Sequence, residues 1–549
     1  MEWTRRNAPT VLFALVLLAA GMLLLALSWN TTFFQDTWAF ILDRRGWSAN
    51  DFLKPHNEHL VPIPVLVTKL QLELFGMGNA RPEIVAMAAT ALAAAALLFV
   101  YVRRRLGPWP ALLAGSLFAL FGAAWPILLW PFQIEFTGPL MAGLATLLLL
   151  EREDRRGDAL ACLALVVTIA FGSLGLPFLA AVAVEIFLKR DARGLGRAYV
   201  VAVPVAFYGA WYLGWGHVAE DHLTLANVLN SPQYAMDGFA SSAGALAGLS
   251  SIPVNSPGEP EWGRPLLLAL IGLALFVKWR RPGISPYFWP VAAAAITYWF
   301  LAAFNYIPGR EAYASRYLYG GGAFVLLMAA SLLEGVRFSP RALAIGAVLT
   351  VLAIGPNLAS MKDGAAWMRE QSVITRADTA ALEIARDTVS PYFPLAPPEV
   401  AGTASLSLVS AALYFDAVEE YGSPAYSPGE LLSAPESGRR WADVVLSKAL
   451  PLSLETRPDT TLPHDPGRCT ILGGGEASEV ELRPGVTRIW VGPGPEAKLF
   501  LRRFAQEEFP VQMGALPGGS LSMLEVPRDR APQPWYLRLL ADQETRLCR

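Results

Sequence analysis

Eleven apolar stretches, separated by loops whose basic residues fall on alternate sides, constrain this 549-residue chain more than any other feature. A membrane-spanning helix needs about 20 mainly apolar residues, and cytoplasmic loops carry an excess of Lys and Arg. The chain is only 16% charged, whereas soluble globular proteins are about 25% charged. These features predict a polytopic membrane protein with a cytoplasmic N-terminus and an extracytoplasmic C-terminus.

The expected spans follow one another from the N-terminus to about two thirds of the chain. They cover residues 9–29, 82–102, 109–125, 134–150, 158–173, 174–188, 198–215, 265–279, 286–304, 317–334 and 341–358. The basic residues that place alternate loops inside are Arg5, Arg6, Arg103–Arg105, Arg152, Arg155, Arg156, Lys189, Arg190, Arg193, Arg197, Lys278, Arg280, Arg281, Arg337 and Arg341. Residues 159–188 are interpreted as a hairpin that turns at Phe171–Gly175. Residues 234–253 could be a further span, but we favour an amphipathic or re-entrant helix on the outer face.

The chain is expected to divide into three regions. Residues 1–358 form an all-α transmembrane domain of about eleven helices, with long outer loops at 30–81 and 216–264. Interfacial helices are expected near 35–46 and 60–76, with Trp38 and Trp47 at the level of the lipid headgroups. Residues 359–465 predict an extracytoplasmic helical region. Short strand-like segments separated by Gly and Pro predict a β-rich domain at 466–549, either a β-sandwich or a jelly-roll.

Three acids are candidates for proton transfer at the outer face. Asp36 lies in F-F-Q-D, directly after the first span, Glu58 lies in P-H-N-E-H, and Glu135 lies at the mouth of a span. A carboxylate near low-dielectric surroundings can serve as a general base. Each acid could instead cap a helix or remain a solvated loop charge.

Histidines and a glutamine accompany these acids on the same side. His56, His59 and Gln133 are candidates for an acceptor or sugar site. His56 and His59 could also bind a divalent metal ion, together with His217 and His222 of the second long loop. Ordinary hydrogen bonding is the alternative, and the sequence indicates no cofactor other than this metal ion.

Two arginines, Arg310 and Arg316, lie in an outer loop that has few other cations. Because guanidinium groups match phosphate geometry, these two are candidates for holding a lipid phosphate. Pairing with Glu311 or interfacial snorkelling is the alternative.

The cysteines predict no disulfide scaffold. Cys162 lies in an apolar run, whereas Cys469 and Cys548 flank the strand-rich region. A bridge between these two would form if the tail lies outside, and two free thiols are the alternative. The net charge of −2 gives no indication of a nucleic-acid partner.

The chain resembles bacterial members of the GT-C glycosyltransferase superfamily, which includes protein O-mannosyltransferases and lipid A aminoarabinose transferases. The residues that carry the resemblance are F-F-Q-D-T-W-A-F (33–40), P-H-N-E-H-L-V-P-I-P (55–64) and S-R-Y-L-Y (315–319), within residues 1–358. Asp36 matches the first-loop catalytic acid of the family. It stands alone here, whereas the family has a pair of acids.

The resemblance implies a multi-pass enzyme of the bacterial plasma membrane. Such an enzyme moves a sugar from a polyprenyl-phosphate donor in the bilayer to a glycan or protein acceptor at the extracytoplasmic face. Asp36 would deprotonate the acceptor in an inverting displacement. The alternative is a non-catalytic membrane protein, namely a lipid or polysaccharide transporter or an assembly factor with an outer binding domain.

Overall fold

The computed structural model describes residues 2–189, 195–249, 262–394, 410–457, 469–472 and 478–548. Arg190, Arg193 and the expected domain boundary at 465/466 lie outside these residues. The chain forms two compact units. Unit 1 comprises Met1–Asn30, Asp43–Gln71 and Arg81–Met368, and unit 2 comprises Thr31–Leu42, Leu72–Ala80 and Arg369–Arg549. This division differs from the expected one because two pieces of the first long loop belong with the tail.

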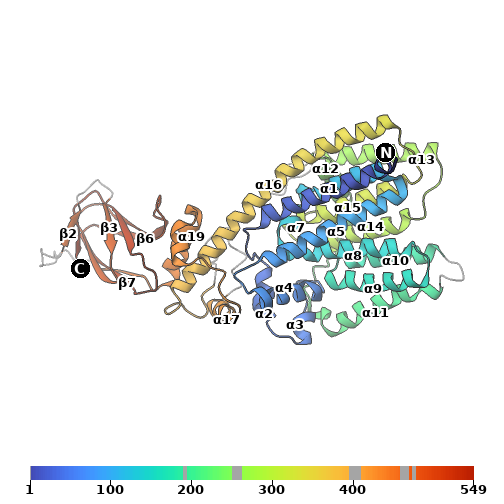
Figure 1. Cartoon of the computed structure of the whole chain (residues 1–549). Coiled ribbons are helices and arrows are strands. Elements are labelled where there is room, and N and C mark those ends of the chain that lie inside the picture. Colours follow the sequence, from blue (N-terminus) through green and yellow to red (C-terminus); the bar gives the residue numbers. More distant parts are fainter. Residues whose placement is uncertain are drawn as a thin grey trace. The chain divides into compact units, whose positions relative to one another are not determined.

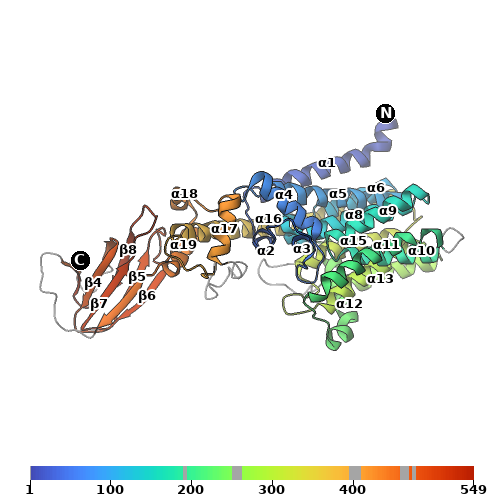
Figure 2. The ribbon, with the colours of Figure 1, turned by 90° about the horizontal axis from the view of Figure 1, so that it is seen from below.

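Unit 1 is a bundle of helices that run alongside one another (Figures 1 and 2). Its helices are α1 (Glu2–Ser28), α3 (Ala49–Leu53), α4 (Pro62–Phe75, whose last turn belongs to unit 2), α5 (Arg81–Leu106), α6 (Pro108–Ala119), α7 (Trp125–Leu129), α8 (Ile134–Leu150), α9 (Arg155–Phe171), α10 (Gly175–Leu188), α11 (Tyr199–Gly214), α12 (Leu225–Leu246), α13 (Gly263–Arg280), α14 (Phe288–Phe304), α15 (Ser315–Leu332) and the first part of α16 (Pro340–Ile384).

Each of the eleven expected spans coincides with a helical segment. Five helical stretches of the described residues are long and apolar enough to cross a membrane, namely Asn7–Ser28, Arg81–Leu106, Pro108–Leu129, Pro131–Leu150 and Pro340–Ile384. The apolar helices α10, α11 and α14 are shorter. The structure therefore has the helices that the hydropathy pattern predicts, and the number that crosses the bilayer stays a prediction.

The helix expected near 234–253 is α12, and its two halves differ. Its N-terminal half exposes apolar side chains such as Leu229, whereas its last turns are buried among α13, α14 and α15. Gly238 permits this packing, because a Cβ atom there would lie 2.4 Å from the Trp299 ring. Small residues at such contacts let membrane helices approach closely. The second half of α12 is therefore a core element of the bundle.

Ion pairs join the helix ends at which the basic residues gather. Arg105 donates to Glu151 over 2.5 Å, and Arg197 contacts Asp158 at 2.7 Å. Both arginines are largely buried. Some of the basic residues that predict the topology therefore also stabilise the packing of neighbouring helices.

Unit 2 combines helices with a β-sandwich. The helices are α2 (Thr37–Asp43), the C-terminal part of α16, α17 (Ala411–Tyr421), α18 (Pro428–Ser433) and α19 (Glu436–Ala449). The strands are β1 (Ser453–Arg457), β2 (Cys469–Leu472), β3 (Ser478–Leu482), β4 (Gly485–Val491), β5 (Ala497–Arg502), β6 (Val511–Leu516), β7 (Ser520–Val526), β8 (Trp535–Leu540) and β9 (Thr545–Cys548).

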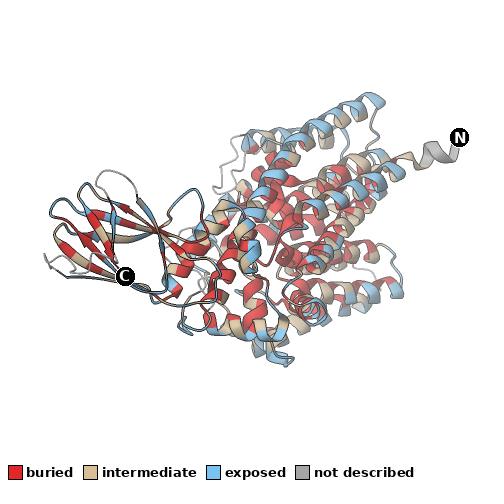
Figure 3. Cartoon of the chain, turned by 60° about the vertical axis from the view of Figure 1, so that its left-hand side comes forward, coloured by how far each residue is buried: buried red, intermediate tan, exposed pale blue. Residues whose placement is uncertain are grey.

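The strands form two antiparallel sheets, ordered β1-β7-β4-β9-β2 and β3-β8-β5-β6. Burial alternates along β5, where Leu499 and Leu501 face inward between exposed or half-buried neighbours. This is the period-2 pattern of a strand with one buried face, and Figure 3 shows buried residues gathered along the strands. Both sheets contribute to one hydrophobic core. The tail therefore contains a β-sandwich as expected, but its first strand, β1, lies in the stretch 359–465 that was expected to be helical.

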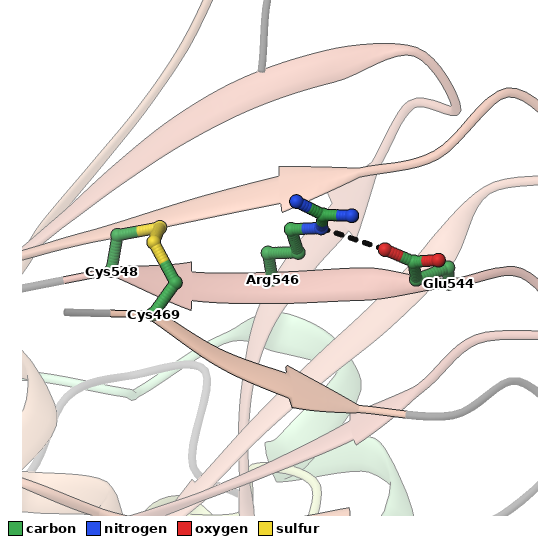
Figure 4. Close-up of a disulfide and its surroundings, with 4 residues drawn as sticks. All are labelled: Cys469, Glu544, Arg546 and Cys548. Atoms are coloured by element: carbon green, nitrogen blue, oxygen red, sulfur yellow. Dashed lines mark hydrogen bonds and ion pairs between the residues drawn. A yellow bond between two sulfur atoms is a disulfide. The ribbon is translucent and has the colours of Figure 1, made fainter. Parts of the chain in front are cut away.

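A disulfide joins Cys469 of β2 to Cys548 of β9, which pair directly in the antiparallel ladder. Figure 4 shows this bridge, with the Arg546–Glu544 ion pair further along β9. The sequence left a bridge and two free thiols as alternatives, and the structure has the bridge. Cys162 is free and buried, as expected for a small apolar side chain in a helix.

Candidate functional site

The candidate site in unit 1 is built around a tight turn in the first long loop. His56 and His59 exchange backbone hydrogen bonds of 3.1 and 2.9 Å. Asn57 closes the turn with a φ of +50°, a left-handed conformation that Asn tolerates better than most residues. The turn fixes the backbone of Glu58, the acid that lies between Asn57 and His59.

The chain that leads into this turn is anchored by two long side chains. Arg44, which is 2% exposed, donates to the carbonyl oxygens of Asp51 and Pro55 over 3.1 and 3.0 Å. Trp211 of α11 donates its indole N–H to the carbonyl oxygen of Leu53 over 2.8 Å. These bonds tie the loop to unit 1 at several points, which favours a fixed geometry at Glu58.

Glu58 forms an ion pair with Arg310, whose Nη1 donates to Oε1 over 2.7 Å. Tyr234 of α12 holds the Arg310 backbone by donating to its carbonyl oxygen over 2.8 Å. The other carboxylate oxygen of Glu58, Oε2, is buried and has no hydrogen-bond partner among the described residues. A carboxylate held by one oxygen can accept a hydrogen bond from a bound hydroxyl through the other.

Opposing effects set the charge of Glu58. Burial opposes ionisation, but the neighbouring His59 and Arg310 outweigh it and hold the pKa of Glu58 below its ordinary value. Burial lowers the pKa of His59, and the charge of Glu58 only partly opposes this shift. The ionised form of Glu58 is therefore favoured by its cationic neighbours in spite of its burial.

His59 also contacts a second loop. Its Nδ1 lies 2.7 Å from the hydroxyl oxygen of Ser173, in the turn between α9 and α10. The adjacent Gly172 lies so close to the start of α8 that a Cβ atom there would come 2.9 Å from the carbonyl oxygen of Glu135. The expected hairpin turn at Phe171–Gly175 therefore lies beside the predicted site. Sequence reasoning identified this turn but not the role of its serine.

A third loop supplies Gln133 and Glu135, which are 6% and 8% exposed. They lie at the junction of the short 3-10 helix Pro131–Gln133 with α8. Phe132, which directly precedes Gln133, packs edge-on against the imidazole of His56, with centroids 5.2 Å apart. The Oε1 atom of Gln133 is buried without a hydrogen-bond partner among the described residues.

The structure thus brings Glu58, His56, His59 and Arg310 together, with Gln133 and Glu135 on the adjoining loop. The other candidates of unit 1, Arg316, His217 and His222, make different contacts. Arg316 is exposed and donates to the carbonyl oxygen of Gly309. His217 is exposed, and His222 contacts Glu220 at 3.5 Å.

The arrangement gives no support to the expected metal site. Within the described ranges, no three His, Cys, Asp or Glu side chains form a group that could hold a metal ion. His56 is occupied with an aromatic contact, and His59 with a serine hydroxyl. The histidines therefore act here as hydrogen-bonding and packing groups.

Asp36 belongs to unit 2 and is described there by itself. It directly precedes α2, and its carbonyl oxygen accepts the N–H of Ala39 over 3.1 Å. Asp36 and Gln35 are half-buried, whereas Phe33, Phe34, Thr37 and Trp38 on either side are buried. Gln35 has a φ of +44°, and such strained backbone is frequent at functional sites. Trp38, expected at the headgroup level, is instead 1% exposed in the core of unit 2.

Comparison with known proteins finds no matching family model and no matching curated protein. ArnT from Cupriavidus metallidurans, bound to undecaprenyl phosphate, is 16% identical with a TM-score of 0.44, over 71% of this chain and 82% of ArnT. An oligosaccharyltransferase from Archaeoglobus fulgidus, in complex with zinc and sulfate, is 14% identical with a TM-score of 0.46, over 80% of this chain and 67% of its own. Since these TM-scores lie below 0.5, no functional argument below rests on them.

Proposed function

We propose that the chain is a membrane glycosyltransferase that moves a sugar from a polyprenyl-phosphate donor to an acceptor at the extracytoplasmic face. The observation that carries the proposal is the convergence of four loops, each next to a predicted span, on the Glu58–Arg310 pair and the His59–Ser173 contact. Largely buried ionisable residues with shifted pKa values, such as Glu58, are frequent at functional sites. The first-loop motifs that resemble the GT-C superfamily agree with this assignment.

The chemistry needs few protein groups. The acceptor hydroxyl oxygen attacks the anomeric carbon, the bond from that carbon to the phosphate oxygen breaks, and polyprenyl phosphate leaves with the electron pair. The hydroxyl proton passes to a carboxylate, which we assign to Asp36 by its resemblance to the family motif. Positioning and proton acceptance are therefore the main contributions required of the protein.

The two arginines are suited to different parts of the donor. Arg310 is already neutralised by Glu58, so this pair is suited to orienting sugar hydroxyl groups through hydrogen bonds. Arg316 is exposed and contacts a backbone carbonyl oxygen rather than a carboxylate. Its charge is therefore better suited to the donor phosphate. The lowered pKa of Glu58 makes it a weaker base, which favours an orienting role over proton abstraction.

Release of undecaprenyl phosphate from synthetic undecaprenyl-phosphate-linked hexoses, in the presence of membrane extract as acceptor, tests the proposal with purified full-length protein. Asp36→Asn should lower the rate about 100- to 10,000-fold, because it removes a proton acceptor while preserving shape. Asp43→Asn is the matched control, since Asp43 is exposed in the same loop. Asp51 is unsuitable as a control because it completes the capping box of α3.

The outcomes separate the proposal from its rival. Acceptor-dependent release that is lost in Asp36→Asn and kept in Asp43→Asn supports the transferase with Asp36 as base. Equal release by both variants would reassign the base to Glu58 or Glu135. No release by the unaltered protein from any of the hexose donors would favour the non-catalytic transporter or assembly factor.

A further inference from the structure

We infer that the C-terminal unit positions Asp36, with Ser372 and Tyr414 as the positioning residues. Only the naming of Asp36 as a base rests on the proposed function. The segment that bears Asp36, Thr31–Leu42, is part of unit 2 together with Arg369–Arg549. The tail is therefore part of the scaffold that holds the predicted base.

The first contact is a backbone anchor. The N–H of Thr32 donates to the hydroxyl oxygen of Ser372 on α16 over 3.1 Å, within a buried environment. Ser372 is 4% exposed and Thr32 is also 4% exposed. Without this acceptor, a buried N–H would lose its partner, which is costly in a low-dielectric interior. Ser372 thus fixes the chain four residues before Asp36.

The second contact is aromatic and lies on the other side of Asp36. Trp38 packs against Phe33 with centroids 6.1 Å apart, and against Tyr414 of α17, also at 6.1 Å. Tyr414 is itself fixed, because its hydroxyl donates to Glu383 of α16 over 2.7 Å. Both ends of the Asp36 turn are therefore held by residues of the tail.

The consequence is visible in the burial pattern. Phe33 and Phe34 before the turn are 2% and 5% exposed, and Trp38 after it is 1% exposed. Asp36 and Gln35 remain half-buried between these anchors. The three backbone bonds Thr37 N–H to Phe34 O, Trp38 N–H to Gln35 O and Ala39 N–H to Asp36 O close the turn. Such support from surrounding packing is what a preorganised catalytic group requires.

Hydrogen–deuterium exchange on the full-length protein tests the inference without any substrate. In Ser372→Ala, amides of residues 32–38 should exchange about tenfold faster, because local opening becomes easier. Ser372→Thr retains a hydroxyl and should exchange like the unaltered protein. The control is Ser447→Ala, since the Ser447 hydroxyl bonds only within its own helix, to the carbonyl oxygen of Val444. It should leave residues 32–38 unchanged.

A second pair of variants protects the test against misfolding. Tyr414→Leu removes the ring beside Trp38, and it should raise amide exchange near Trp38 as much as Ser372→Ala does. Tyr414→Phe keeps the ring and should leave the exchange unchanged. In the undecaprenyl phosphate release assay, run well below the melting temperature of every variant, Ser372→Ala should lower the rate and Ser372→Thr should restore it. Equal exchange at residues 32–38 in all variants would overturn the inference. Absence of release by the unaltered protein would overturn the proposed function and leave the exchange result independent of it.

Discussion

Glu58 and Arg310 are 252 residues apart in the chain, yet Oε1 of one accepts a 2.7 Å hydrogen bond from Nη1 of the other. The two side chains are 15% and 17% exposed. The pair joins the first long loop to the loop before α15. Both side chains are largely shielded from water, so removing either one would leave an unpaired buried charge, which destabilises the folded protein.

The Glu58–Arg310 pair should show strong energetic coupling. In a double-mutant cycle, Glu58→Gln and Arg310→Met should each destabilise unit 1, and the coupling free energy should be about 1–3 kcal/mol. Thermal unfolding in detergent is the measurement. Arg316→Met is the control, because Arg316 is exposed and has a backbone partner. Additive effects of the two single variants would contradict a direct interaction.

The pH dependence of stability should follow the lowered pKa of Glu58. A carboxylate whose pKa is lower in the folded state contributes stability that is fully present above its unfolded pKa, about 4.3. That contribution is lost as the pH falls through the lower folded value. The difference in melting temperature between the unaltered protein and Glu58→Gln should thus stay constant from about pH 7 to about pH 5 and shrink below about pH 4. If the difference in melting temperature already shrinks above about pH 5, which is the upper limit for an ordinary carboxyl group, the pKa of Glu58 is raised and the prediction is wrong.

The Cys469–Cys548 bridge should resist alkylation until the protein is reduced. The bridge closes a loop with a sequence separation of 79, for which chain entropy predicts about 4 kcal/mol of stabilisation. Replacing both cysteines by serine should lower the unfolding midpoint of unit 2 accordingly. Mass mapping gives the state of each thiol, and alkylation of both residues before reduction would contradict the prediction.

The orientation in the membrane can be tested by cysteine labelling in a Cys162→Ala background, in which the native bridge is kept. A cysteine at Glu220 or Lys448 should react with an impermeant reagent from outside, because the basic loops should lie inside. A cysteine at Arg156 should react only after the membrane is opened. All three positions are exposed. External labelling at Arg156 would reverse the topology and with it the side of the proposed chemistry.

The sequence predicted features that depend on local patterns. Hydropathy located the helical segments, since a span is defined by the apolarity of consecutive residues. Strand-like segments separated by Gly and Pro located strands such as β5, along which Leu499 and Leu501 are buried. The hairpin turn at Phe171–Gly175 followed from the basic residues on both of its flanks. These elements need no knowledge of distant parts of the chain.

Features that depend on long-range packing could not be predicted in the same way. The hydrophobic Trp38 is compatible with a lipid interface and with a protein core, and only the tail's α17 decides between them. The partner of Glu58 was equally open, because the sequence offered Glu311 as the nearer acid for Arg310. The role of Ser173 had no local signal, because a serine between glycines is also ordinary turn composition.

The contact between Thr32 and Ser372 bridges 340 positions of sequence, and this has a consequence for biosynthesis. Residues near Asp36 leave the ribosome early, whereas the serine that anchors them and the tyrosine that packs beside them follow hundreds of residues later. The Asp36 turn therefore lacks its two anchors while the helices of unit 1 are being synthesised. The turn gains both anchors only when α16 and α17 have folded, so we expect a chain that ends before Ser372 to leave the Asp36 turn unsupported.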